Sequence, residues 1–180
     1  NSLLTMAFEI LSSSYLKISE KSKLSLIKRL SECSGHLGIA GGQYLDLNFE
    51  KKKVSKNKII NMEVKKTGKL FSFCCSAVPI INNRSVKEIN FFDKIGSKIG
   101  LLFQIADDLI DYQGSSKIAG KKTGKDKKKG KATLISLLGY KNAVKYNENI
   151  KFKIISDLDK NNFKSNNLNE TLDYILKRNK

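Results

Sequence analysis

Apolar residues recur along the chain at intervals of three and four positions, which is the spacing of amphipathic α-helices. The pattern predicts helices over residues 2–16, 21–46, 57–78, 86–112, 132–147, 150–162 and 167–178. Pro79 is the only proline, and it marks the expected end of the third of these helices. Because no repeat and no linker interrupts the pattern, the sequence predicts an all-α fold in a single domain over residues 1–180.

Glycines interrupt the helical pattern at two places. Gly35, Gly38 and Gly42 lie in the second predicted helix, where they lower helix stability but permit another helix or a substrate to approach closely. Gly68 lies in the middle of the third helix and costs up to about 1 kcal/mol there. Two explanations of Gly68 are open: a kink that turns a backbone carbonyl into a cavity, or a harmless interior glycine.

The helix predicted over residues 86–112 contains the most informative run, FQIADDLID at residues 103–111. It places three carboxylates among apolar residues, where burial of charge is expensive. On a helix Asp107 and Asp111 lie about 40° apart on one face, and Asp108 flanks the same patch. Such carboxylates repel one another unless a hard cation neutralises them, and oxygen ligands favour Mg²⁺ over zinc. The alternative explanation of the cluster alone is a solvated acidic helix face.

A segment rich in lysine and glycine follows the aspartates. It has the sequence GKKTGKDKKKGK over residues 120–131, and residues 114–130 show no apolar periodicity. This pattern predicts a polar loop that stays mobile until a ligand binds. Carboxylates beside lysines suit a metal-bridged polyphosphate, because acids hold Mg²⁺, the ion bridges phosphate oxygens and ammonium groups take up the remaining charge.

Four motifs follow one another along the chain: GQYLDL at residues 42–47, KTG at 66–68, FQIADDLID at 103–111 and the glycine-lysine loop at 120–131. In this order they closely resemble the trans-prenyl diphosphate synthases of the polyprenyl synthetase family. The two ends of the chain also resemble bacterial short-chain members such as farnesyl diphosphate synthases, so the resemblance spans essentially the whole chain. It implies an isoprenoid-synthase-type helical bundle around a central cavity.

The resemblance implies metal and diphosphate ligands. Asp107 and Asp111 would bind Mg²⁺ directly, Asp108 would lie beside or behind them, and Asp126 would hold a metal-bound water. The diphosphate would be bound by three lysines: Lys66, Lys121 and Lys131.

The resemblance also implies catalytic groups. The Lys66 carbonyl, the Thr67 hydroxyl and the Gln104 amide oxygen would face an allylic cation, because dipoles stabilise positive charge without trapping it covalently. Gln43 and Asp46 would shape the floor of the pocket. The implied reaction is a Mg²⁺-dependent condensation of an allylic diphosphate with isopentenyl diphosphate, giving farnesyl or geranylgeranyl diphosphate in a homodimeric enzyme.

Two departures from the family pattern matter for this interpretation. Relatives carry an earlier DDxxD motif, whereas this chain begins at Asn1 and has one aspartate-rich cluster. Many relatives also have the sequence KxTYP after the loop, where this chain has KATLI at residues 131–135. We therefore expect the C-terminal part of a synthase, without its N-terminal helices and inactive by itself. The alternatives are a non-catalytic regulatory subunit of a heteromeric prenyl diphosphate synthase and, less fittingly, a class I terpene cyclase.

The net charge of +17 makes nucleic acids and membrane surfaces partners to consider. The lysine runs lack interleaved aromatic residues and any nucleic-acid-binding signature, so nucleic acid is not an expected partner. The apolar stretch at residues 70–81 is too short to span a bilayer. Three cysteines without a CxxC pattern are typical of a cytoplasmic protein, or of one in an organelle matrix if a transit peptide has been lost. The single histidine, His36, argues against histidine-based triads and zinc sites.

Overall fold

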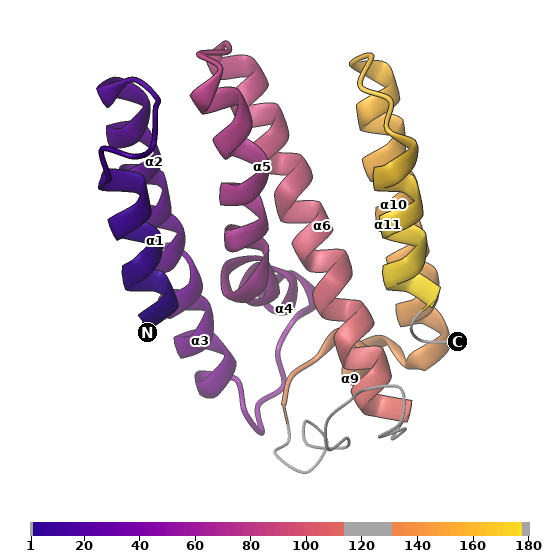
Figure 1. Cartoon of the computed structure of the whole chain (residues 1–180). Coiled ribbons are helices and arrows are strands. Elements are labelled where there is room, and N and C mark those ends of the chain that lie inside the picture. Colours follow the sequence, from indigo (N-terminus) through magenta and orange to yellow (C-terminus); the bar gives the residue numbers. More distant parts are fainter. Residues whose placement is uncertain (1, 114–130, 178–180) are drawn as a thin grey trace.

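The computed structural model describes residues 2–113 and 131–177, and every regular element within these ranges is helical (Figure 1). The elements are α1 (Ser2–Ser12), α2 (Glu20–Ser34), α3 (Ile39–Asn48), α4 (Lys56–Glu63), the π-helical turn η1 (Val64–Gly68), α5 (Lys69–Ile81), α6 (Val86–Gln113), α9 (Leu134–Leu138), α10 (Tyr140–Lys160) and α11 (Asn166–Lys177). The predicted all-α class is confirmed for these residues. No helix in this part of the chain is long and apolar enough to cross a membrane.

The 28-residue helix α6 forms the centre of the fold. Helices α5 and α10 both pack along α6, and α2 packs on α5. In Figure 1 three pairs of helices stand side by side, α1 with α2, α5 with α6, and α10 with α11, while α3, α4 and α9 gather at one end. The C-terminal part of α6 reaches the same end, so segments far apart in the sequence meet there.

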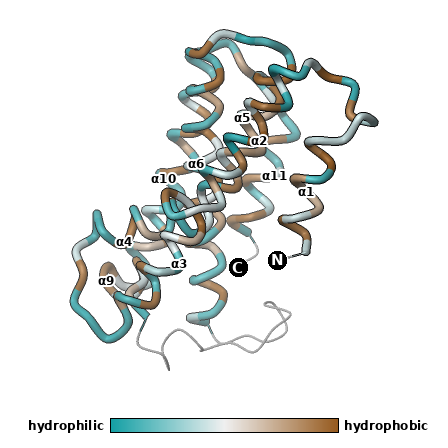
Figure 2. The backbone as a smooth tube through the Cα atoms, turned by 90° about the vertical axis from the view of Figure 1, so that its left-hand side faces the viewer, coloured by the Kyte–Doolittle hydropathy of each residue, from teal (hydrophilic) through white to brown (hydrophobic). Residues whose placement is uncertain are grey.

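Buried apolar residues at helical spacing explain the central place of α6. Figure 2 shows apolar and hydrophilic positions alternating along the helices, as amphipathic helices require. Two glycines let α5 and η1 approach α6 closely: a Cβ at Gly96 would lie 2.4 Å from the Phe71 backbone oxygen, and one at Gly100 would lie 2.5 Å from the Gly68 Cα. The residues of α6 in the core include Ile95, Ile99, Leu102, Ile105 and Leu109.

The prediction of one helix over residues 21–46 is wrong, since two helices, α2 and α3, occupy this range. Gly38 lies immediately before α3, and a Cβ at this position would lie 1.9 Å from the backbone oxygen of Cys33. Only a residue without a side chain allows the chain to fold back this tightly. The glycines of this region therefore end one helix and begin another.

Two further helix boundaries differ from the prediction. Helix α5 continues through Pro79 to Ile81, although proline disfavours a helix interior by removing a hydrogen bond and crowding the carbonyl one turn earlier. The helices predicted over residues 132–147 and 150–162 are instead the short α9 and the continuous α10, since the chain turns at Gly139 with a φ of 78°. Asn147 lies within α10, and its buried side-chain amide donates a hydrogen bond to the Leu102 carbonyl.

Candidate active site

A polar cavity of about 290 Å³ lies where α3, α4, η1, the C-terminal part of α6 and the segment before α9 meet. Its lining contains all three predicted metal ligands and two of the predicted diphosphate lysines. The predicted site residues that line this cavity are Lys66, Gln104, Asp107, Asp108, Asp111 and Lys131. The fold therefore gathers into one place residues that the sequence separates by up to 65 positions.

The three aspartates of α6 differ in burial. Asp108 is 7% exposed and Asp111 is 6% exposed, whereas Asp107 is half-buried. The side-chain amide of Gln104, one helical turn earlier, donates a hydrogen bond of 2.7 Å to the Asp108 carboxylate. A solvated acidic helix face is therefore excluded for Asp108 and Asp111, and the structure fixes the orientation of Asp108 from within its own helix.

Asp46 binds both lysines of the cavity. Its Oδ2 atom lies 2.6 Å from the Lys66 Nζ and 3.3 Å from the Lys131 Nζ. Helix α3 can bring Asp46 this close because it packs against η1, where a Cβ at Gly42 would lie 2.2 Å from the Lys66 backbone nitrogen. The buried Asp46 carboxylate thus holds two ammonium groups, from distant segments, beside the aspartates of α6.

The KTG motif forms most of the π-helical turn η1. Of the two explanations of Gly68, this irregular turn favours the kink over the harmless interior glycine, and π turns are frequent at functional sites. The Thr67 hydroxyl donates a hydrogen bond of 2.7 Å to the Gln104 side-chain oxygen, and Gln104 in turn donates to Asp108. A continuous polar chain therefore links η1 to the predicted metal ligands.

Two predicted site residues lie outside the described residues: Lys121 and Asp126. The same holds for the expected mobility of the loop over residues 114–130. These remain predictions of the sequence.

Glu63 is a cavity residue that the sequence interpretation missed. It is the last residue of α4 and is 2% exposed. Among the described residues, neither of its carboxylate oxygens has a hydrogen-bond partner of ordinary geometry. Burial is the main reason that the pKa of Glu63 lies well above its usual value of 4.5, and the negative charge of Asp108 raises it further. The Leu134 backbone amide and the Lys66 ammonium act in the opposite direction. The only sequence signal was its position one turn before Lys66.

The raised pKa of Glu63 predicts a stability difference that depends on pH. A carboxyl group with a pKa above 4.5 in the folded state stabilises the fold below pH 4.5 relative to higher pH, and this contribution is lost as the pH rises through the folded pKa. Glu63→Gln should therefore become increasingly more stable than the wild type above pH 4.5, by up to about 1.4 kcal/mol per pH unit. Urea unfolding of both proteins from pH 4 to pH 8 measures the difference.

The charged neighbours of Glu63 set the control for this comparison. The charged groups that act on it are Asp108 on α6, Asp46 on α3 and Lys66 on η1. These groups are present in both proteins, so the difference isolates Glu63 together with its coupling to Asp108. A constant offset between the two unfolding curves over this pH range would contradict the predicted pKa shift.

The chemistry of the cavity fits a hard divalent cation. Its carboxylate oxygens are the ligands that Mg²⁺ prefers. Glu63 adds two buried oxygens that have no hydrogen-bond partner of ordinary geometry in the part of the chain that the structure describes. In the arrangement seen for residues 2–113 and 131–177, no three Asp, Glu, His or Cys side chains lie close enough together to hold an ion. An ion bound here would therefore take other oxygen ligands as well, such as phosphate oxygens or water.

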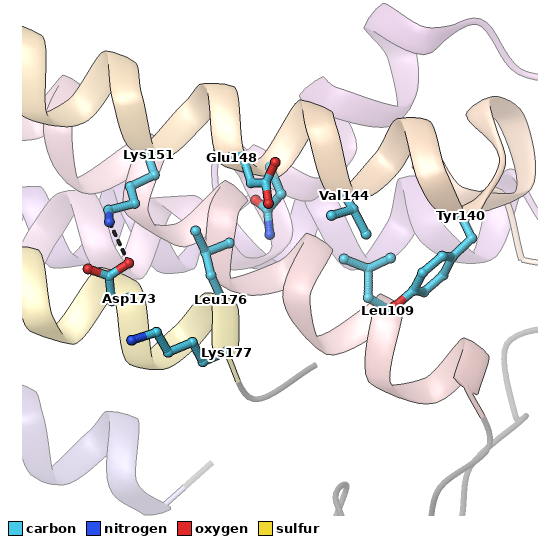
Figure 3. Close-up of a pocket in the computed structure, with 9 residues that line it drawn as sticks. Leu109, Tyr140, Val144, Glu148, Lys151, Asp173, Leu176 and Lys177 are labelled. Atoms are coloured by element: carbon cyan, nitrogen blue, oxygen red, sulfur yellow. Dashed lines mark hydrogen bonds and ion pairs between the residues drawn. The ribbon is translucent and has the colours of Figure 1, made fainter. Parts of the chain in front are cut away.

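A second cavity, of about 490 Å³, lies between α6, α10 and α11 (Figure 3). An ion pair between Lys151 and Asp173 crosses its rim, and Leu109, Val144 and Leu176 form an apolar wall. None of the predicted site residues lines this cavity. The candidate chemistry is thus confined to the smaller, more polar cavity at the end of α6.

The fold and the site together define a class of protein: an all-α bundle in which aspartates on a central helix share a cavity with lysines from a KTG turn and from the end of a loop. Residues 1–175 match the polyprenyl synthetase family, and the chain belongs to this family. The resemblance predicted from the four motifs is thereby confirmed.

Individual relatives are consistent with this assignment. The chain is 37% identical to the farnesyl diphosphate synthase of Micrococcus luteus, covering 100% of this chain and 61% of the relative. It is 31% identical to that of Escherichia coli strain K12, covering 100% of this chain and 62% of the relative. Its fold is similar to that of a Helicobacter pylori geranyltransferase whose structure is complexed with magnesium and isoprenyl diphosphate. The TM-score is 0.82 at 30% sequence identity, and the match covers 98% of this chain and 57% of that one. The chain spans about three fifths of the length of these relatives.

Proposed function

We propose that this chain forms the metal- and diphosphate-binding part of a short-chain trans-prenyl diphosphate synthase. The enzyme would condense an allylic diphosphate with isopentenyl diphosphate and release farnesyl or geranylgeranyl diphosphate. The observation that carries the proposal is the convergence of the GQYLDL, KTG and DDxxD motifs on one cavity. The names of the Micrococcus luteus and Escherichia coli relatives, and the magnesium and isoprenyl diphosphate in the Helicobacter pylori structure, support it.

The residues proposed to hold Mg²⁺ are Asp107, Asp108 and Asp111. The bound ion would supply positive charge that stabilises the departing pyrophosphate. The protein keeps the Asp108 carboxylate oriented through Gln104 before any ligand arrives. Such preorganised groups need no rearrangement at the moment of reaction, which is where much of their catalytic effect comes from.

Lys66 and Lys131 are proposed to bind the diphosphate, with Lys121 joining them from the loop. Both described ammonium groups already lie at the cavity because Asp46 holds them there. A diphosphate carries more negative charge than a single carboxylate and offers more acceptors, so it would compete with Asp46 for these lysines. The lysines would thus be positioned for the diphosphate without the entropy cost of ordering them during binding.

Thr67 and Gln104 are proposed to stabilise the allylic cation together with the Lys66 carbonyl. The Thr67 proton is engaged with Gln104, so the lone pairs of the hydroxyl oxygen are available for positive charge. As the allylic C–O bond breaks, pyrophosphate leaves, and the isopentenyl double bond supplies the electrons of the new C–C bond. The proton lost from the isopentenyl unit would pass to the released pyrophosphate.

We also propose that the enzyme is a homodimer. Helix α1 contains no buried residue, and it exposes Leu3, Leu4, Met6 and Ile10. Exposed apolar residues gathered on one helix are typical of an interaction site, and we propose that a second copy of the chain covers them. The cytoplasmic location and the lack of a nucleic-acid partner stay predictions of the sequence.

A product assay on the protein encoded by the complete open reading frame tests the proposed function. The assay supplies Mg²⁺, isopentenyl diphosphate and dimethylallyl, geranyl or farnesyl diphosphate, and mass spectrometry measures the chain length of the product. A fifteen- or twenty-carbon diphosphate is the expected result. No product, combined with tight binding to an active synthase, would instead favour the regulatory subunit.

A further inference from the structure

Glu63 reaches the cavity from a different helix than the predicted metal ligands do. Asp107, Asp108 and Asp111 all belong to α6, whereas Glu63 ends α4. It lines the same cavity and lies near enough to Asp108 for the two charges to interact. The carboxylates of the cavity therefore come from separate elements.

The described lining of the cavity carries an excess of negative charge. It contains five carboxyl groups, which are Asp46, Glu63, Asp107, Asp108 and Asp111, and two ammonium groups, which are Lys66 and Lys131. Carboxyl groups therefore outnumber ammonium groups in the described lining. Lys66 and Lys131 both form ion pairs with Asp46, so Lys66 acts on Glu63 only through its charge. Such an excess favours the binding of a divalent cation.

Glu63 is also costly for the protein to bury. Its two oxygens are inaccessible to solvent, and within residues 2–113 and 131–177 they have no hydrogen-bond partner of ordinary geometry. A buried charge without a partner is strongly destabilising, and an apolar side chain of similar volume would be cheaper at the same place. Among the described residues, the Leu134 backbone amide and the Lys66 ammonium offset only part of this cost, because the pKa of Glu63 stays well above its usual value. A cation in the cavity would offset more of it.

We propose that Glu63 is a further carboxylate of the cation site, which strengthens the binding of a divalent metal ion in the cavity. The inference rests on the proposed function, because that function places the ion beside the α6 aspartates. Glu63 supplies negative charge from the α4 side, and Gln104 and Thr67 orient the α6 side. Its role is to position and retain the ion, not to touch the reacting carbon atoms.

Binding of Mn²⁺ in the presence of inorganic pyrophosphate tests this inference without relying on turnover. Free Mn²⁺ is measured by electron paramagnetic resonance on the protein from the complete open reading frame. Glu63→Gln should weaken Mn²⁺ binding about tenfold, as expected for the loss of one nearby unit charge. Glu170→Gln removes an exposed carboxylate of α11 and should leave the affinity unchanged. The midpoint temperature of thermal unfolding, measured in EDTA, should be as high for Glu63→Gln as for the wild type, or higher. If Glu63 had a purely structural role, its replacement would lower this temperature.

The outcomes separate this inference from the proposed function. If Asp107→Asn weakens Mn²⁺ binding but Glu63→Gln stays within twofold of the wild type, the role of Glu63 is overturned and the proposed site stands. If the wild type binds no Mn²⁺ with pyrophosphate, the proposed site fails and the inference fails with it. If Glu63→Gln lowers the midpoint temperature of unfolding in EDTA, the variant Glu63→Asp, which keeps the charge, decides. An Mn²⁺ affinity near that of the wild type supports the role of the Glu63 charge, and weakened Mn²⁺ binding overturns it.

Discussion

Replacing Asp107 by alanine is expected to lower kcat/KM about 10²- to 10³-fold, the range seen when one preorganised group that stabilises developing charge is removed. Asp107 is half-buried and lines the cavity, so its loss removes a ligand charge without opening a hole in the apolar core. Asp108 and Asp111 remain in place, which leaves weakened metal binding instead of none. The variant should therefore also need a higher Mg²⁺ concentration for half-maximal rate. Steady-state rates at varied Mg²⁺ measure both effects.

The matched control for this variant is Asp159→Ala. Asp159 is exposed on α10, away from the cavity, and its removal changes the net charge by the same amount. Its rate and its Mg²⁺ dependence should equal those of the wild type. Wild-type turnover with an unchanged Mg²⁺ requirement in Asp107→Ala would remove this residue from the metal site.

Local sequence patterns predict most of the helices. The predicted helix boundaries are wrong where tertiary contacts or an unusual backbone conformation determine where a helix ends. The apolar spacing of α6 is strong enough to predict a helix within a residue of the one observed. The break at Gly38 depends on how closely the chain passes its own backbone at Cys33, and the turn at Gly139 depends on a positive φ. Neither condition is visible in hydrophobic periodicity, since glycine is compatible with both continuation and interruption of a helix.

The sequence also predicts the candidate site only in part, because several of its contacts depend on how the helices pack. The spacing of the α6 aspartates predicts a shared carboxylate patch, and the family resemblance brings Lys66, Thr67 and Gln104 to it. Spacing cannot show that Asp46 is the common partner of two lysines, because that contact depends on the packing of α3 against η1. Glu63 was missed for a similar reason: a glutamate near lysines in a sequence is usually an exposed residue, and only the fold buries it.

The ion pairs of Asp46 with Lys66 and Lys131 are expected to link stability with activity. Lys66→Ala should lower kcat/KM about 10²- to 10³-fold, because it removes a charge-assisted contact to the diphosphate.

Asp46→Asn should lower the free energy of unfolding by about 1–3 kcal/mol, since it leaves two cavity lysines without their shared carboxylate. The side chains of Lys66 and Lys131 are 24% and 20% exposed, so solvent screening reduces this loss below that of a fully buried pair.

A double-mutant cycle of Asp46→Asn and Lys66→Met separates the ion pair from the effects of each single substitution. If the pair is energetically coupled, the double variant loses less unfolding free energy than the sum of the two single losses. Urea unfolding gives the stabilities, and inorganic pyrophosphate titrated into Asp46→Asn measures how far an anion replaces the missing carboxylate. Lys58→Ala, at an exposed position of α4, serves as the control for loss of a lysine. Additive losses, with no stabilisation of Asp46→Asn by pyrophosphate, would show that Asp46 does not hold these lysines for the diphosphate.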